Sequence, residues 1–352
     1  MKLIVQIPCL NEADTLPRVV AAIPRRIPGV ERVEVLIVDD GSTDGTPEIA
    51  RNVGVDHVVR HVGNKGLAQA FRTGVDACLR LGADVIVNTD GDDQYPGAEI
   101  PGLIAPILRG EADMVVADRQ IGTIDHFSPT KKLLQKVGSW AVRRASRTDV
   151  PDAPSGFRAY SREAALRINV ISAYSYTVET LIQAGARRTA IAHVPISVNA
   201  ETRPSRLMGS TVNYLKHQIA TIVRTYAMYE PLRVFTILGS LVLLTGVGLV
   251  VRFLLYFVRG DPGHVQSLVL AAALLVVGLQ ILLNGLLADL IAANRRLVEE
   301  TLYKLRRMEA IDAGSAPDPR PAAAPVSDAD GRPDRGDLAG QEERGRDQVR
   351  IV

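Results

Sequence analysis

Residues 84–94 read DVIVNTDGDDQ, an apolar run followed directly by acidic and amide side chains. A short apolar run rich in branched residues is typical of a buried strand. Similar runs occur at residues 1–8, 33–38 and 114–117, with a weaker one at 57–61. Between them, the apolar residues of 67–81 recur with a period near 3.6, which indicates a helix. Alternating strands and helices predict an α/β fold with a mostly parallel, doubly wound sheet.

Polar side chains follow three of the expected strands at the point where each strand ends. They are Asn11 and Glu12 after the first strand, Asp39 and Asp40 after the second, and Asp90, Asp92 and Asp93 after the fourth. In an open parallel sheet, ligands bind beside the carboxyl ends of the strands. We therefore expect a ligand site at this edge of the sheet.

The Asp90 cluster has the composition of a site for a hard cation. Carboxylates this close together repel one another unless a cation or a basic group compensates them, and oxygen ligands favour Mg2+ or Mn2+. An acidic turn or helix cap would use the same residue types and remains an alternative. A calcium loop is excluded for both acidic clusters, because the twelfth position is Arg51 in one and Pro101 in the other, where a Glu is required.

Common nucleotide-binding motifs are missing from the sequence. No GxGxxG run follows a strand and no GxxxxGK[ST] run occurs, which removes the usual dinucleotide and NTPase interpretations. A nucleotide site built from carboxylates remains, since Asp and Glu can accept hydrogen bonds from ribose hydroxyls and base N–H groups.

Composition excludes several broad classes of protein. The chain has 352 residues, enough for about two domains, with 41 basic and 39 acidic residues, so nucleic acid is not the expected partner. Its two cysteines, Cys9 and Cys78, are too few for a disulfide framework, which favours a reducing compartment. The mean hydropathy of +0.09 conceals two long apolar runs in the last third of the chain.

These two runs predict a transmembrane hairpin over 234–291, with helices at about 234–258 and 266–291. At about 1.5 Å per residue each helix can cross a hydrocarbon core of about 30 Å. Basic residues flank both ends of the pair, whereas the connecting loop carries only Arg259. Both termini should therefore face the cytoplasm, in the inner (plasma) membrane.

The remaining boundaries follow from composition. Residues 1–208 are the expected catalytic domain on the cytoplasmic side. Residues 209–230 form an amphipathic pattern that suits a helix on the membrane surface, or alternatively a core helix of the domain. Residues 313–352 are dominated by Pro, Ala, Asp, Gly and Arg and are expected to be disordered.

The motifs in their order along the chain resemble glycosyltransferase family 2, which has the GT-A fold. The resemblance rests on residues 8–12 (PCLNE), 39–46 (DDGSTDGT), 64–66 (NKG), 90–94 (DGDDQ), 118–119 (DR) and 155–158 (SGFR). The D-x-D-x-Q form, the amphipathic segment and the hairpin are similar to the polyprenyl-phosphate (dolichol-phosphate) branch. The likeness covers about residues 1–296.

The resemblance implies roles for individual residues. The base, ribose and diphosphate of a nucleotide sugar would contact Pro8, Leu10, Asn11, Glu12, Asp39, Asp40, Ser42, Lys65, Asp90, Arg203 and Arg206. The metal, Mg2+ or Mn2+, would be held by Asp90, Asp92 and Gln94. The acceptor phosphate would meet Arg119, with Lys132 and Lys136 as helpers, and Asp152 stands where the family often has a catalytic carboxylate. The chain departs from the family at Arg203-Pro204-Ser205-Arg206, where a G-x-S-K run is common.

The implied reaction is the inverting transfer of a sugar from a UDP- or GDP-sugar to polyprenyl phosphate at the cytoplasmic leaflet. Its partners would be the nucleotide sugar, the polyprenyl phosphate, membrane lipids and further copies of the chain, such as a tetramer. Three alternatives remain open: an enzyme acting on another membrane lipid, a polysaccharide synthase, and a non-enzymatic scaffold that binds nucleotide sugars.

Overall fold

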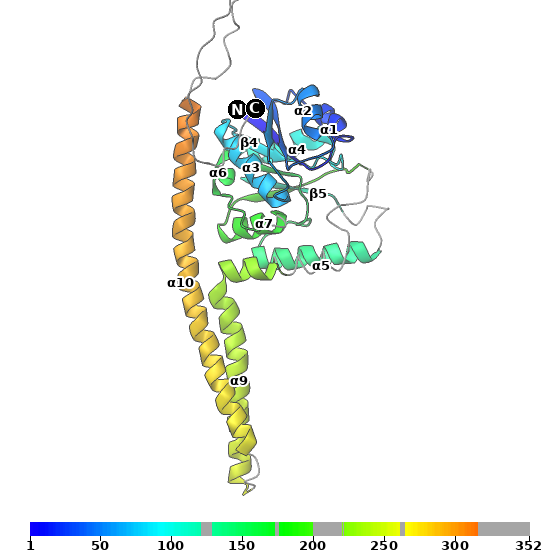
Figure 1. The fold of residues 1–352 in the computed structure, drawn as a ribbon. Coiled ribbons are helices and arrows are strands. Elements are labelled where there is room, and N and C mark those ends of the chain that lie inside the picture. Colours follow the sequence, from blue (N-terminus) through cyan, green and yellow to red (C-terminus); the bar gives the residue numbers. More distant parts are fainter. Residues whose placement is uncertain (121–128, 173–175, 200–219, 221, 261–264, 316–352) are drawn as a thin grey trace, which may run out of the picture.

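The structure is a computed structural model that describes residues 1–120, 129–172, 176–199, 220, 222–260 and 265–315 (Figure 1). The side chains of 129–137 and 310–315 are also outside this description. The predicted segments at 209–219 and 316–352 therefore cannot be compared with it.

One mixed sheet of seven strands organises the described part of residues 1–199, in the order β3-β2-β1-β4-β6-β5-β7. The strands are β1 (Lys2–Cys9), β2 (Arg32–Asp39), β3 (His57–Arg60), β4 (Val85–Asn88), β5 (Met114–Asp118), β6 (Arg158–Ser161) and β7 (Ile191–Pro195). β1, β2, β3 and β4 pair in parallel, as do β5 and β7. The five strands predicted from the sequence all form at nearly the expected positions.

The sequence analysis did not anticipate two of the strands, β6 and β7, of which β6 matters more for the site. The strand β6 runs antiparallel between β4 and β5, with Asn88 of β4 opposite Arg158. Its four residues, Arg158–Ser161, are too short for a period to be recognised. The antiparallel insertion brings residues 152–158 to the carboxyl end of β4.

Helices cover both faces of the sheet and bury two apolar layers. α1 (Leu16–Ala22), α2 (Thr46–Asn52) and α4 (Ile100–Leu108) contribute to the layer that contains Leu3, Val5 and Ile7. α3 (Leu67–Arg80), α5 (Pro129–Ser146), α6 (Arg162–Arg167) and α7 (Thr177–Ala186) contribute to the layer that contains Ile4 and Ile86. Alternate residues of β1 thus face opposite layers, as the period of a strand requires.

Two long apolar helices follow, and both could cross a membrane by length and composition. α9 (Pro231–Val258) and α10 (Val265–Ser315) pack side by side and project away from the sheet (Figure 1). Most of their apolar side chains are exposed in the chain alone. Residues 222–229, directly before α9, are helical.

The helix α10 is much longer than the 266–291 expected from its apolar run, and it continues to Ser315. Its charged second half returns along the sheet domain, beside α3 and α6 (Figure 1). Arg306 pairs with Asp76 of α3 at 3.1 Å, and the Tyr303 hydroxyl donates to Glu163 of α6 at 3.0 Å. This half is a strap, residues 295–309, that ties the apolar pair to the sheet domain.

Candidate active site

Loops from the carboxyl ends of β1, β2 and β4 meet at one edge of the sheet. The backbone N–H of Asn11 donates to Ser42 Oγ at 2.9 Å, and that of Glu12 donates to Thr46 Oγ1 at 2.9 Å. The Thr15 hydroxyl donates to the Gly91 carbonyl oxygen at 2.6 Å. These bonds bring the predicted residues Asn11, Glu12 and Ser42 together beside the Asp90 loop.

The two carboxylates that end β2 have different surroundings. Asp39 is buried; its Oδ1 accepts from the Ser42 N–H at 2.9 Å and its Oδ2 lies 3.0 Å from Arg60 Nε. Asp40 is also buried and accepts from the N–H groups of Lys65 and Gly66, each at 2.8 Å. Asp40 therefore holds the 64–66 loop against the site.

A buried histidine completes the environment of Asp40. His61 Nδ1 lies 2.7 Å from Asp40 Oδ1, and its Nε2 lies 3.0 Å from the Thr73 hydroxyl. These contacts make His61 a structural support for Asp40. The Lys65 side chain itself is exposed.

Asp90 is the most perturbed carboxylate of the candidate site. Burial and the neighbouring charge of Asp92 raise the pKa of Asp90 to about 7, against the opposing charge of Arg119. The next turn is closed by Asp92, whose Oδ1 accepts from the Gln94 N–H at 3.1 Å. A divalent cation would favour the ionised form of these buried and crowded carboxylates.

The predicted metal ligands Asp90, Asp92 and Gln94 thus share one short loop and carry oxygen atoms suited to Mg2+ or Mn2+. Within the described part of the chain, no group of three or more His, Cys, Asp or Glu side chains is arranged to hold a metal ion. The predicted ligand set is two carboxylates and an amide, and the third carboxylate of the loop, Asp93, lies 3.7 Å from Arg18.

A buried ion pair stands next to this loop. Arg119, at the end of β5, donates from Nε to Asp152 Oδ2 at 2.7 Å and from an Nη atom to Oδ1 at 2.9 Å. Asp152 is fully buried and also accepts from the Arg119 backbone N–H at 3.2 Å. Because both carboxylate oxygens are engaged, the geometry makes Asp152 a support for Arg119 and disfavours it as a general base.

Beneath Asp90 lies a buried polar network that the sequence analysis missed. Asn88 donates to the Gly156 carbonyl at 2.9 Å and to the Tyr176 hydroxyl at 2.8 Å, and it accepts from Gln6 at 2.9 Å. The Gly156 N–H donates to the Tyr95 hydroxyl at 3.2 Å. The network fixes Gly156 against the Asp90 carboxylate.

Arg158 is another buried residue whose role the sequence did not reveal. It is fully buried and donates to the carbonyl oxygens of Ser155, Thr177 and Ala153 at 2.7–2.8 Å. The motif SGFR signalled that this segment matters, yet only the structure shows that the arginine joins the 153–155 turn to α7.

The other predicted residues are only partly described. Pro8 lies in β1 opposite Val38 of β2, and Leu10 follows the strand half-buried. Lys132 and Lys136 lie on α5, but their side chains are outside the described part. Arg203 and Arg206 are outside the described residues altogether.

Similarity to a solved structure defines the class of fold. Glucosyl-3-phosphoglycerate synthase from Mycobacterium tuberculosis, in complex with Mn2+, UDP-glucose and phosphoglyceric acid, aligns with a TM-score of 0.52 and 25% identity. The alignment covers 64% of this chain and 80% of that one. The sheet with acidic loops at its carboxyl edge is therefore a GT-A-like fold, as predicted.

Sequence comparison defines the family. Residues 4–168 match the family described as glycosyl transferase family 2. An uncharacterized glycosyltransferase of Mycobacterium tuberculosis is 32% identical over 209 residues, which are 58% of this chain and 89% of that protein. The polyprenol monophosphomannose synthase of Mycolicibacterium smegmatis is 28% identical over 229 residues, 62% of this chain and 85% of the relative. The chain belongs to glycosyl transferase family 2 and is a glycosyltransferase, which confirms the predicted family.

Proposed function

We propose that this glycosyltransferase moves a sugar from a UDP- or GDP-sugar to polyprenyl phosphate, with inversion, at the cytoplasmic leaflet. The observation that carries the proposal is the meeting of the Asp39, Asp90 and Asp92 loops with Arg119 in a chain that continues into two apolar helices. A relative named polyprenol monophosphomannose synthase supports the acceptor. The product would be a polyprenyl-phosphate sugar.

The donor would lie across the carboxyl edge of β1, β2 and β4. The Oδ2 atom of Asp39 lies near Arg60 but accepts no hydrogen bond from the described residues. It would accept one from a base N–H or a ribose hydroxyl of the donor. Pro8, Leu10, Asn11 and Glu12 would line the base. Ser42 and Asp40 would act less directly, because their described bonds hold the surrounding loops.

The donor's diphosphate would lie at the Asp90 loop, where Asp90, Asp92 and Gln94 would hold Mg2+ or Mn2+. The raised pKa of Asp90 supports this fit, because the loop has an excess of negative charge that a cation would balance. The Mn2+ and UDP-glucose complex of the similar synthase supports it as well. The bound cation would neutralise the charge that develops on the leaving diphosphate. Arg203 and Arg206 would approach the same diphosphate.

The acceptor phosphate would be oriented by Arg119, held in place by Asp152, with Lys132 and Lys136 nearby on α5. A phosphate monoester has a second pKa of about 6 and is already anionic at neutral pH. Its oxygen can therefore attack the anomeric carbon without a general base. This agrees with an Asp152 whose two oxygens are both occupied by Arg119.

The apolar pair would anchor the enzyme beside its lipid acceptor, which raises the effective concentration of that acceptor. The strap contacts the sheet domain, so the end of the second helix and residues 1–199 would lie on the same side of the membrane. Basic residues at both helix bases favour the cytoplasmic side. We extend the proposal to a catalytic unit of 1–208, a surface segment of 209–230 and a hairpin of 234–291.

The test is transfer by the purified full-length protein in vesicles that contain polyprenyl phosphate. A panel of labelled UDP- and GDP-sugars is supplied with Mg2+ or Mn2+, and the extracted lipid is examined for a polyprenyl monophosphate sugar. Asp92→Asn should lower the transfer rate by about 100-fold or more, since it removes stabilisation of the leaving group. The matched control is Asp93→Asn, one residue away in the same turn, which should retain most activity.

Transfer to a lipid alcohol, and none to polyprenyl phosphate, would contradict the proposed acceptor. An Asp92→Asn protein that works as well as the wild type would contradict the proposed metal site.

A further inference from the structure

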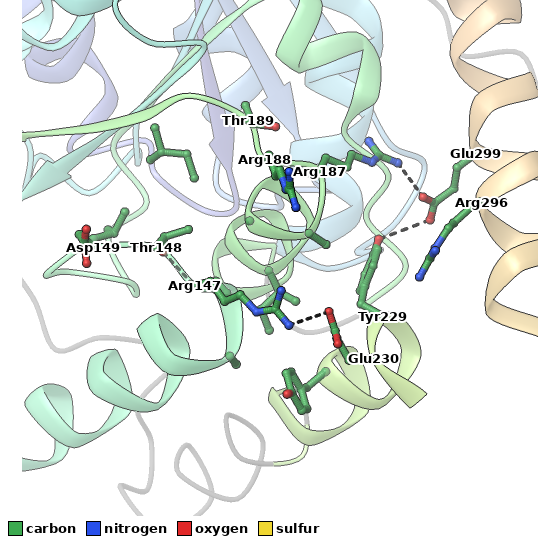
Figure 2. Close-up of a pocket in the computed structure, with 18 of the residues that line it drawn as sticks. Arg147, Thr148, Asp149, Arg187, Arg188, Thr189, Tyr229, Glu230, Arg296 and Glu299 are labelled. Carbon is green, nitrogen blue, oxygen red and sulfur yellow. Dashed lines mark hydrogen bonds and ion pairs between the residues drawn. The ribbon is translucent and has the colours of Figure 1, made fainter. Parts of the chain in front are cut away.

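A large pocket lies where the sheet domain meets the two apolar helices, apart from the candidate active site (Figure 2). Its volume is about 860 Å³. Its walls come from the ends of α5 and α7, from β7, from residues 226–230 before α9, and from α10. Its lining includes four arginines and three acidic residues: Arg147, Arg187, Arg188, Arg296, Asp149, Glu230 and Glu299.

The acidic side chains Glu230 and Glu299 of this pocket are already neutralised by arginines. Arg147 pairs with Glu230 at 3.0 Å, and Arg187 pairs with Glu299 at 2.6 Å (Figure 2). Each glutamate also has a second partner, Arg233 at 3.8 Å and Arg295 at 2.8 Å respectively.

Arginine is still in excess after these pairs are formed, since Arg188 and Arg296 remain against the single carboxylate of Asp149. Arg188 and Arg296 are exposed on the wall and form no ion pair with any described residue. Arginines without an ion-pair partner in the described part of the chain suit an anionic ligand.

Backbone conformation gives an independent indication. Arg188 has a φ of 55° and closes α7 with its N–H bonded to the Gly185 carbonyl at 3.1 Å. Arg147, directly after α5, has a φ of 57°. Helices that end in this left-handed conformation usually place glycine there, because a side chain is strained. Both positions instead hold an arginine that lines the pocket.

The pocket lies at the depth expected of lipid headgroups. Glu230 directly precedes α9, and Arg296 lies eight residues beyond the uncharged run of α10, which ends at Ala288 before Asp289. Charged residues begin on both helices near these positions, as they do at a membrane interface.

We propose that this pocket binds the phosphate diester of an anionic phospholipid such as phosphatidylglycerol, through Arg188 and Arg296. The guanidinium group is planar, weakly hydrated and suited to paired hydrogen bonds with phosphate oxygens. Because Arg188 belongs to α7 and Arg296 to α10, the lipid joins the catalytic unit to its anchor. This inference rests on the membrane placement given under the proposed function.

The experiment measures lipid retained by the full-length protein in detergent, by native mass spectrometry. Phosphatidylglycerol and phosphatidylcholine of equal chain length are added at equal concentration. We expect the wild-type protein to retain phosphatidylglycerol in preference to phosphatidylcholine. In Arg188→Gln/Arg296→Gln, the affinity for phosphatidylglycerol should fall about tenfold, which is the equivalent of one charge-assisted contact. The control, Arg224→Gln/Lys304→Gln, removes two exposed charges outside the pocket and should retain the lipid.

Three results would overturn the proposal: equal retention of both lipids, unchanged retention in the pocket variant, or displacement by inorganic phosphate at the lipid's own concentration. The last would indicate a site for soluble phosphate. Thermal unfolding in detergent verifies that both double variants are folded.

Sugar transfer in phosphatidylcholine vesicles is measured separately, to distinguish this inference from the proposed function. A wild type that retains the lipid but transfers no sugar would contradict the proposed function and leave this site intact.

Discussion

Gly156 has space for a hydrogen atom against the Asp90 carboxylate but not for a methyl group. A Cβ atom there would lie 3.0 Å from Asp90 Oδ2 and 3.0 Å from the Tyr176 hydroxyl. The Tyr176 hydroxyl is held by Asn88 at 2.8 Å, so it cannot move away freely. The glycine therefore sets the position of the carboxylate that we assign to the metal.

Gly156→Ala should lower kcat/KM for sugar transfer by about 10- to 100-fold, because it displaces Asp90. Overpacking should also cost about 1–3 kcal/mol of unfolding free energy. Steady-state kinetics and chemical denaturation measure the two effects. Gly102→Ala is the control, since a Cβ there meets nothing within 4 Å. Transfer at the wild-type rate by Gly156→Ala would refute the tight contact.

Glu34, far from the candidate site, allows a prediction about pH. Burial raises its pKa, but hydrogen bonds and charges of His57 and Lys2 outweigh burial and lower the pKa from 4.5 to about 2. A depressed pKa stabilises the fold above the unfolded value, and this stability is lost as the pH falls from about 4.5 to 2. At pH 7 the contribution is on the order of 2–3 kcal/mol.

Glu34→Gln should therefore lower the free energy of unfolding at pH 7 and have little effect near pH 2. Denaturant unfolding at several pH values measures the difference between variant and wild type. The control is Glu111→Gln, whose partner Arg109 is exposed, and it should change stability little at any pH. A deficit in Glu34→Gln that is the same at pH 7 and pH 2 would contradict the ion-pair explanation.

For single residues, the sequence predicted which residues belong to the site better than which residues contact one another. Asp90 and Asp92 could be selected because they follow a strand directly, and the structure finds them crowded with Arg119 nearby. The pairing of Arg119 with Asp152 joins residues 33 apart through a loop, which no local period reports. The burial of Arg158 likewise depends on the antiparallel placement of β6.

Among the elements, the parallel strands and the apolar helices were the most predictable, because long apolar runs leave few alternatives. The length of α10 was not, since its second half is charged and resembles a solvated helix in composition. The predicted hairpin implied that α9 and α10 pack together, but the residues in contact required the structure. Glycines of both helices lie at this contact, and a Cβ on Gly278 would lie 2.9 Å from the backbone nitrogen of Leu243.

Gly278→Leu should separate α9 from α10, because the atoms it meets belong to backbone and cannot rotate away. We expect the unfolding temperature of the detergent-solubilised protein to fall by several degrees, which circular dichroism at helical wavelengths measures. Gly248→Leu is a matched control on α9, since a Cβ there meets nothing within 4 Å. Equal unfolding temperatures for the two variants would rule out close packing at Gly278.

For the whole molecule, the strap is the connection that sets how the catalytic unit sits over its anchor. Arg306 also donates to the Ile168 carbonyl, and the Arg167 guanidinium lies 4.1 Å from the centre of the Tyr303 ring. Burial raises the pKa of Asp76, which Arg306 partly offsets. A strap fixed at these points should matter for a substrate held in the membrane and not for the chemistry itself.

Tyr303→Ala/Arg306→Ala should therefore release the strap while leaving the active site intact. Transfer to long-chain polyprenyl phosphate in vesicles should fall by about tenfold, because orientation toward the membrane is lost. Transfer to a short, water-soluble polyprenyl phosphate should be unchanged. Hydrogen exchange of residues 295–309 should become faster.

The control is Lys304→Ala/Met308→Ala, because both side chains are exposed on the same helix. Equal losses with both acceptors would mean that the strap supports the active site itself, and no loss with either would mean that other contacts hold the unit in place.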